Sequence, residues 1–262
     1  LPNVIKIRFR GQRGNGFTSD MSVDDVSIVD MGNYNDMSAE ALQLTGVDYH
    51  VVPLAHASFN FESSVANRGG STMDSVIVSV SSGTFMSSDT IPTAPACGFD
   101  TTIVMNGTFI PTSFGPKKVN LTVSAKQIDD DLSNNTISKL IIVSDTVFAK
   151  TDSTVVGGIG SNTTPLEMGQ VYTLKTTDTL SSVSYYLNSP TVGDSIRFKL
   201  YSMMNGQPAN LITTSKYTTA PAAGWHTFRM GCDTILGAGD YLVVIEQVKS
   251  LNNIAAGYNF NY

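Results

Sequence analysis

The chain has 262 residues, of which 41% are hydrophobic and 15% are charged, and its net charge is −6 at pH 7. This hydrophobic content supports packed cores and argues against a disordered chain. The scattered lysines and arginines argue against a nucleic-acid partner, because phosphate recognition needs clustered cationic side chains. No apolar stretch approaches the roughly 18 residues that a membrane-spanning helix requires.

The first ten residues, LPNVIKIRFR, alternate apolar and cationic side chains as a strand does. Because no leader segment precedes this strand, we expect a fragment or a processed piece that begins partway through a domain. Residues 1–30 hold about two strands, too few to bury a core of their own. We therefore assign 1–30 to the end of a domain that lies mostly upstream.

The strongest helix signal is MSAEALQL, residues 37–44, a run of helix formers that follows Asp36. Asp36 is a suitable N-cap, but Glu40 falls one position late for a capping box. The segment is also too short to be stable as an isolated helix. We assign residues 31–45 to a linker.

Strand signals dominate the rest of the chain. Between residues 46 and 149, apolar and polar residues alternate in about seven short runs, the number found in an immunoglobulin-like sandwich. Val76, Val78 and Val80 form one such apolar face. Turn sequences such as NRGG at 67–70 and FGPK at 114–117 separate the runs.

A second sandwich is expected after the polar, Gly-rich stretch KTDSTVVGGIGSNTT at 150–164, which we interpret as a linker. Residues 165–262 hold further strands, separated by turns such as MNGQP at 204–208. The block ends on the strand-like YNFNY, so we expect it to be truncated. The predicted fold class is all-β, with tandem β-sandwich domains: a partial jelly roll, an immunoglobulin-like sandwich and a jelly-roll-like sandwich.

The adjacent aspartates Asp24 and Asp25 interrupt a strand-like segment near the start of the chain. Strand alternation places their carboxylates on opposite faces, so one of them points inward. An inward carboxylate needs either a cation or several N–H donors. Both interpretations stay open: a calcium site, whose remaining oxygen ligands would come from elsewhere, or a hydrogen-bonded structural aspartate.

The segment GNGFTSDMSVDDVSIVD, residues 14–30, resembles the closing strands of jelly-roll domains of the MAM and cleaved-adhesin type. In that type a Gly-rich turn is followed by a strand that ends in a paired-aspartate motif. The resemblance implies that most of this jelly roll lies upstream. It also implies calcium at Asp24 and Asp25, because related jelly rolls often hold that ion at such a position.

The middle block resembles the immunoglobulin-like adhesion modules of secreted Bacteroidetes proteins. The resemblance rests on SSVANRGGSTMDSVIVSV at 63–80 and AKQIDDDLSNNTISKLIIVSD at 125–145. The last block, with GQVYTL and GDYLVVIEQ, resembles the sandwich that often follows in the same multidomain proteins. Many of these are cargo of the type IX secretion system, which implies a secreted or surface location in a Gram-negative bacterium and a larger parent chain.

Eight aspartates are followed by Ser or Thr and then by an aliphatic residue or Thr. The pattern resembles the O-glycosylation signal of Bacteroidetes periplasmic and surface proteins. The alternative is that Asp-Thr is a natural junction between a turn and a strand. The candidate acceptor residues are Ser75, Thr90, Thr101, Thr146, Ser153, Thr179, Ser195 and Thr234.

No catalytic constellation is recognisable, and we assign no catalytic residue. The three histidines, His50, His56 and His226, belong to no known hydrolase or metal-binding motif. The four glutamates show no paired spacing. The run DDDLSNN at 129–135 has the composition of a calcium loop but lacks its Gly and Glu, so we interpret it as a solvated hairpin turn. Cys97 and Cys232 are predicted to be unpaired, small and at least half-buried.

The last block is rich in aromatic residues that could stack on a sugar. The single tryptophan, Trp225, occurs with Tyr185, Tyr186, Tyr201 and Tyr217. We name Trp225, Tyr185 and Tyr201 as candidate stacking residues. The alternative is that these rings belong to the sandwich core, with Trp225 buried at the start of a strand.

The sequence therefore predicts a non-catalytic structural or adhesive region of a large secreted or surface-attached bacterial protein. Its expected partners are other surface proteins or glycans, and no cofactor is expected apart from a Ca²⁺ ion. The alternative is a carbohydrate-binding accessory region of a surface hydrolase or peptidase.

Overall fold

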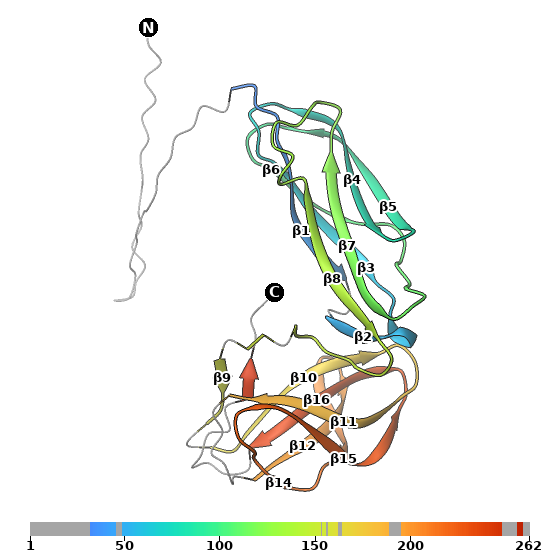
Figure 1. Cartoon of the computed structure of the whole chain (residues 1–262), viewed down its shortest axis with the longest axis vertical. Helices are drawn as coiled ribbons and strands as arrows, with labels where there is room; N and C mark the ends of the chain where they lie inside the picture. The colour runs from blue at the N-terminus through green and yellow to red at the C-terminus, as the bar shows by residue number, and fades with distance from the viewer. Residues whose placement is uncertain are drawn as a thin grey trace, which may run out of the picture.

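The computed structural model describes residues 32–45, 49–152, 154–155, 157–161, 164–188 and 195–247, and the backbone of 256–258. These residues form two β-sandwiches that pack end to end (Figure 1), which confirms the prediction of an all-β chain with tandem sandwiches. No helix among the described residues is long and apolar enough to cross a membrane. The expected jelly-roll segment 1–30 lies outside the described residues.

The first sandwich consists of a three-stranded sheet and a five-stranded sheet. The small sheet has the order β1-β3-β6, with β1 at Met37–Thr45, β3 at Asn60–Asn67 and β6 at Phe99–Val104. The large sheet has the order β2-β8-β7-β4-β5, with β2 at Val51–Pro53, β8 at Thr136–Ser144, β7 at Gly115–Ser124, β4 at Met73–Ser82 and β5 at Phe85–Ala94.

The core of this sandwich forms because alternate residues of each strand point inward. Val76, Val78 and Val80 of β4 are fully buried, as the alternation predicts, and Val119 and Leu121 of the neighbouring β7 are fully buried as well. The edge strand β5 contains a proline in its sequence FMSSDTIPTA, and an edge is where a strand tolerates a residue without an N–H donor.

The linker and helix signal assigned to residues 31–45 are corrected by the structure. Residues 37–45 form β1, which pairs antiparallel with β3. A register shift between Ala39 and Ala41 inserts one extra residue, so the buried apolar positions are Met37, Ala39, Leu42 and Leu44. This bulge interrupts the two-residue alternation of a strand. The resulting spacing of the apolar residues is similar to that of a helix.

The second sandwich contains two sheets of four and five strands. One has the order β10-β16-β12-β13, with β10 at Leu166–Leu174, β16 at Gly239–Gln247, β12 at Ser195–Met204 and β13 at Gln207–Thr214, while the short β14 at Thr218–Thr219 also pairs with β12. The other has the order β15-β11-β17-β9, with β15 at Gly224–Leu236, β11 at Asp178–Leu187, β17 at Ala256–Tyr258 and β9 at Gly157–Ile159.

The second sandwich takes one strand from the stretch that the sequence assigned to a linker. Residues 157–159 of the Gly-rich segment form β9, which pairs with β17. The tight turn of the β12–β13 hairpin agrees with its sequence. Asn205 and Gly206 have φ values of 51° and 74°, as a two-residue Asn-Gly turn requires. The core lies between the sheets around Phe198, Leu200 and Ile245.

Candidate functional site

The acidic run at 129–131 forms part of a latch between two segments of the first sandwich. Asp129 Oδ2 accepts hydrogen bonds from Met37 N at 2.8 Å and from Asn135 Nδ2 at 3.1 Å. Asp130 Oδ2 accepts one from Asn35 N at 2.8 Å. We call Asn35, Met37, Asp129, Asp130 and Asn135 the acidic latch. It secures the start of β1 to the loop between β7 and β8.

The latch differs from the solvated turn that the sequence predicted, because Asp129 is only 9% exposed. Its carboxylate is stabilised by N–H donors, which is the alternative to a cation for a buried acid. Asp131, by contrast, is held within the loop, where the donors of Ser133 lower the pKa of its carboxyl group. No group of three or more His, Cys, Asp or Glu among the described residues is placed to hold a metal ion. Asp24 and Asp25, the predicted calcium ligands, lie outside the described residues.

Two glutamates that sequence spacing did not connect face each other on the outer surface of the second sandwich. Glu167 of β10 and Glu246 of β16 are direct partners in the antiparallel register. Like charges placed opposite each other destabilise a sheet. Lys199 of β12 removes this repulsion, because its Nζ contacts Glu167 Oε1 and lies 3.0 Å from Glu246 Oε1. We call these three residues, with Arg197, the charged cluster.

Arg197 completes the charged cluster by contacting both carboxylate oxygens of Glu246. Burial raises the pKa of Glu246, but the donors Arg197 and Lys199 outweigh it and hold the pKa below its ordinary value. The Tyr217 ring covers Arg197, with its centroid 4.6 Å from the guanidinium carbon. The Tyr201 hydroxyl donates to Glu167 Oε2 at 3.2 Å. Every charge here has an opposite charge as its partner.

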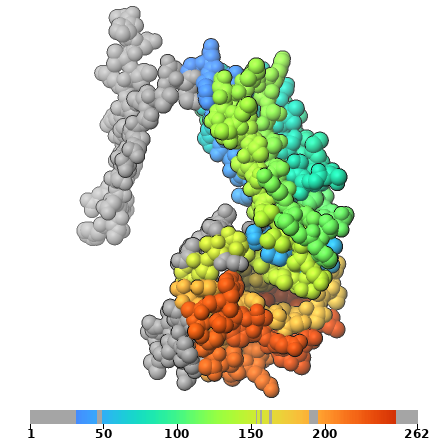
Figure 2. Space-filling model, viewed as in Figure 1, coloured from blue at the N-terminus to red at the C-terminus, as the bar shows by residue number. Residues whose placement is uncertain are grey.

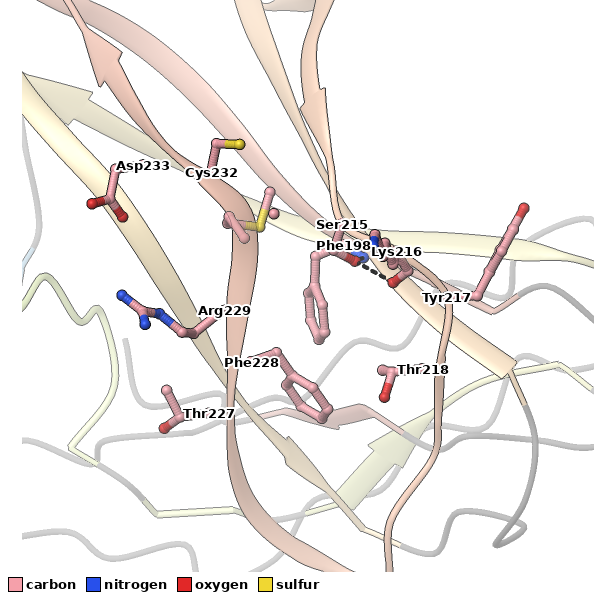
Figure 3. A pocket seen from close by; sticks show the side chains of 12 residues that line it. Phe198, Ser215, Lys216, Tyr217, Thr218, Thr227, Phe228, Arg229, Cys232 and Asp233 are labelled. Carbon is pink, nitrogen blue, oxygen red and sulfur yellow. Dashed lines mark hydrogen bonds between the residues drawn. The ribbon is translucent and has the colours of Figure 1, made fainter.

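An open cavity of about 740 Å³ lies at one side of the second sandwich. Figure 3 shows the rings of Phe198 and Phe228 pointing into it from β12 and β15, and their centroids are 4.7 Å apart. Tyr217 and Thr218 line the opposite rim. Phe198 is fully buried and belongs to the hydrophobic core, so the cavity lies directly against the edge of this core.

The contact between the two sandwiches is the most extensively built site in the described part of the chain. The Tyr49 hydroxyl donates to Thr173 O at 3.0 Å and accepts from Thr173 N at 2.7 Å. The Tyr49 ring also stacks on Tyr172 and meets the edge of Phe148. Phe148 and Tyr172 pack against both hydrophobic cores. Burial raises the pKa of Tyr49 to about 12.

A buried histidine adds a second polar connection to this contact. His56 Nδ1 accepts a hydrogen bond from Lys175 N at 3.2 Å, so the ring proton is on Nε2. His56 Nε2 then donates to Asp178 Oδ2 at 3.0 Å. The Lys175 ammonium contacts Ser58 O, and burial lowers the pKa of Lys175. His56, which belongs to no recognisable sequence motif, is buried and joins the two sandwiches.

We call Tyr49, His56, Phe148, Tyr172, Thr173, Lys175 and Asp178 the joint. Tyr49, His56 and Phe148 belong to the first sandwich and lie around β2 and the short turn after it. These two elements meet the end of β10 and the start of β11 (Figure 1). β10 is an edge strand, and the joint occupies the N–H groups of Thr173 in this strand and of Lys175 just after its end. The space-filling view shows the two sandwiches in direct contact there (Figure 2).

The three predicted stacking residues lie in different environments. Tyr185 points into the core, where its hydroxyl donates to Val243 O and burial raises its pKa. Tyr201 lies on the other sheet beside the charged cluster. Trp225 is 46% exposed, which contradicts the alternative of a buried tryptophan, and its ring neighbour is Tyr186 at 5.6 Å.

The candidate glycosylation residues and the cysteines lie mainly at the surface. Ser75, Thr90, Thr146 and Thr179 are exposed, Thr101, Ser195 and Thr234 are half-buried, and Ser153 lies outside the described residues. Cys97 and Cys232 are free and exposed, which corrects the expectation of half-buried side chains. Cys97 adopts a φ of 61° in the turn before β6, and this turn carries the thiol into solvent.

No protein-family model matches the chain, and no curated protein matches it. Among solved structures, it is similar to the CARDB domain of the PF1109 protein from Pyrococcus furiosus, seen in a crystal structure in complex with di-metal ions and in a solution NMR structure. Both are 21% identical and cover 43% and 44% of this chain and 96% and 99% of their own, with TM-scores of 0.34 and 0.33. A likeness of this size supports no argument, so the fold assignment rests on the strand pairing described above.

Proposed function

We propose that the chain is a stiff, non-catalytic segment of a larger protein, which spaces and orients the domains on either side of it. The observation that carries this proposal is the joint. Two sandwiches linked only by a flexible peptide would move independently. Here the Tyr49 hydroxyl and the His56 ring each make two hydrogen bonds across the contact, and shared aromatic packing surrounds them.

The chemistry of the described residues supports a non-catalytic role. His56 is occupied within the joint, and His226 Nε2 bonds to Ala222 O at 2.7 Å. The one glutamate pair brought together by the fold is neutralised by Lys199 and Arg197. Each of these groups has a structural partner within its own sandwich or across the joint.

The proposal places this segment outside the cell, in a secreted or surface-attached protein of a Gram-negative bacterium. Its support is the sequence resemblance to adhesion modules of Bacteroidetes type IX cargo. A further support is that Ser75, Thr90, Thr146 and Thr179 are exposed and thus accessible for O-glycosylation. Mass spectrometry of the protein from its native source tests this location. Hexose on several of these residues is the expected result, and bare residues throughout would contradict it.

The two exposed cysteines allow a direct test of stiffness. Cys97 lies in the first sandwich and Cys232 in the second, so both accept spin labels without further engineering. Electron–electron double resonance between these labels should give one narrow distance distribution. A broad distribution in the unmodified chain would reject the proposal.

A matched pair of variants connects that result to the joint. The double variant Tyr49→Phe/His56→Ala removes hydrogen bonds across the contact and should broaden the distance distribution. Tyr217→Phe, which changes a 55% exposed tyrosine away from the joint, should leave the distribution unchanged. An equally narrow distribution in the double variant would show that the joint does not hold the two sandwiches together.

A further inference from the structure

The outer face of the β11–β15 pair presents an ordered row of aromatic, hydroxyl and cationic side chains. Antiparallel register places three outward pairs side by side, while the alternate residues Val183, Tyr185 and Phe228 face the core. We call this row the β11–β15 strip. Its pairs are Tyr186 with Trp225, Ser184 with Thr227, and Ser182 with Arg229.

The aromatic end of the strip is an unburied platform. Trp225 is 46% exposed, and its ring meets Tyr186 edge to face at 5.6 Å and 68°. Neither ring packs against the hydrophobic core of the sandwich. A large apolar ring is normally placed where it can be buried, so the exposed Trp225 beside the half-buried Tyr186 indicates a surface that is stabilised when a ligand covers it.

The rest of the strip offers hydrogen-bonding groups to solvent. Ser184 Oγ and Thr227 Oγ1 bond to each other at 2.8 Å, which leaves one hydroxyl donor and several acceptor positions unused. The Arg229 guanidinium is exposed and has no hydrogen bond or ion pair with any residue that the structure describes. In Figure 3, Thr227, Arg229 and Asp233 lie on one side of β15, and the Phe228 ring lies on the other.

We propose that the β11–β15 strip binds a short stretch of a glycan chain. One pyranose ring stacks its C–H face on Trp225, and hydroxyl groups of the following rings bond to Thr227, Ser184 and Arg229. Trp225 and Arg229 are four residues apart on a strand, which corresponds to about 13 Å. That length suits an oligosaccharide better than a single sugar. This binding role goes beyond the proposed spacing function and does not depend on it.

The composition of the strip favours a glycan over other ligands. It contains no aliphatic side chain, whereas the buried centre of a protein–protein interface is mainly apolar. A single guanidinium is too few for a nucleic-acid backbone. Hydroxyl pairs alone do not make the argument, because Ser79–Ser88 and Ser64–Thr102 form them on the first sandwich. Only the pair of Ser184 and Thr227, among these three, adjoins an exposed aromatic platform.

The single tryptophan makes the test specific, because Trp225 is the only indole in the chain. We would titrate the full chain with hexasaccharides of glucose, mannose, xylose, N-acetylglucosamine and galacturonic acid at up to millimolar concentration. At least one of them should change the tryptophan emission saturably. Calorimetry with that sugar should then show binding lost in Trp225→Ala and weakened at least about tenfold in Thr227→Val and Arg229→Met, the effect of losing one good hydrogen bond.

Matched controls separate binding from folding. Ser79→Ala/Ser88→Ala removes an equivalent hydroxyl pair from the first sandwich and should bind the sugar normally. Thr227→Val keeps Trp225, so its folding and its emission can be compared directly with those of the wild type. A preference for the galacturonate chain would mean that Arg229 contributes most of the binding energy. A preference for a neutral chain would mean that stacking on Trp225 contributes most of it.

Three results would overturn the proposal. The first is that none of the hexasaccharides changes the emission at millimolar concentration. The second is a glycan that binds equally well to Trp225→Ala. The third is concentration-dependent self-association of the wild type that Trp225→Ala abolishes, which would make the strip a contact between copies of the chain.

Discussion

Lys199 stabilises a pairing of two glutamates that would otherwise repel each other. The register of β10 and β16 sets Glu167 against Glu246, and the cation of β12 lies between their carboxylates. Burial disfavours the charged form of Lys199, but its bonds to the two glutamates outweigh burial and raise its pKa above the ordinary value. The three strands are therefore joined by charge as well as by backbone hydrogen bonds.

Replacing Lys199 with methionine should lower the unfolding free energy by roughly 3 kcal/mol, because Glu167 then loses its cation and faces Glu246, which keeps only Arg197 as a partner. The pH dependence should change as well. Because the folded pKa of Glu246 is lowered from 4.5, its contribution is complete above about pH 4.5 and is lost as the pH falls through the folded pKa. Wild-type stability should fall on acidification, while Lys199→Met should become relatively more stable as one carboxylate is protonated.

Urea unfolding at pH 7 and pH 4 measures both effects. Lys216→Met is the matched control, since Lys216 is exposed on the same sandwich and its ammonium has no partner among the described residues. Equal unfolding free energies of Lys199→Met and Lys216→Met at pH 7 would show that Lys199 of the charged cluster does not stabilise the fold.

At the scale of single elements, β1 is a strand that the sequence pattern did not predict. Alternation correctly predicted β4, and MNGQP at 204–208 correctly predicted a turn, because both signals are local. β1 was missed because its bulge changes the spacing of its buried residues. The glutamate pair was missed for another reason: Glu167 and Glu246 meet only through a long-range register that no local pattern specifies.

The acidic latch predicts how β1 is held at its first residue. Asp129→Ala removes the acceptor of the Met37 N–H and leaves this buried donor unpaired, which should cost about 2–3 kcal/mol. Amide exchange at Met37 should accelerate, because β1 is an edge strand with β3 as its ladder partner. Hydrogen-exchange NMR together with urea unfolding measures the two quantities.

Asp131→Ala is the control for the latch, since the carboxylate of this half-buried residue bonds only within its own loop. Its stability should lie within about 0.5 kcal/mol of the wild type. Calcium and EDTA should both leave the exchange of the Met37 amide in the wild type unchanged, because N–H donors already satisfy Asp129. A stabilisation by calcium that Asp129→Ala removes would instead identify the loop as a cation site.

At the scale of the whole molecule, the joint converts two separate sandwiches into one unit. Its polar bonds all involve the free edge of β10 or the start of β11, so the first sandwich covers an edge that would otherwise be open to other strands. The sequence could not predict this arrangement. Tyr49 and Thr173 are 124 positions apart, and His56 has no motif around it that indicates an interdomain role.

Tyr49→Phe tests the joint with the smallest possible change. The ring still stacks on Tyr172, but Thr173 loses both the acceptor for its N–H and the donor to its carbonyl. Leaving these groups unpaired at a buried contact costs roughly 1–3 kcal/mol, which corresponds to about tenfold to hundredfold faster exchange of the Thr173 amide. Exchange at Lys175 should rise less, because His56 Nδ1 remains as its acceptor. Exchange rates at Thr173 that match the wild type would mean that the contact opens without breaking these bonds, and the joint would then not be the stiff element of the chain.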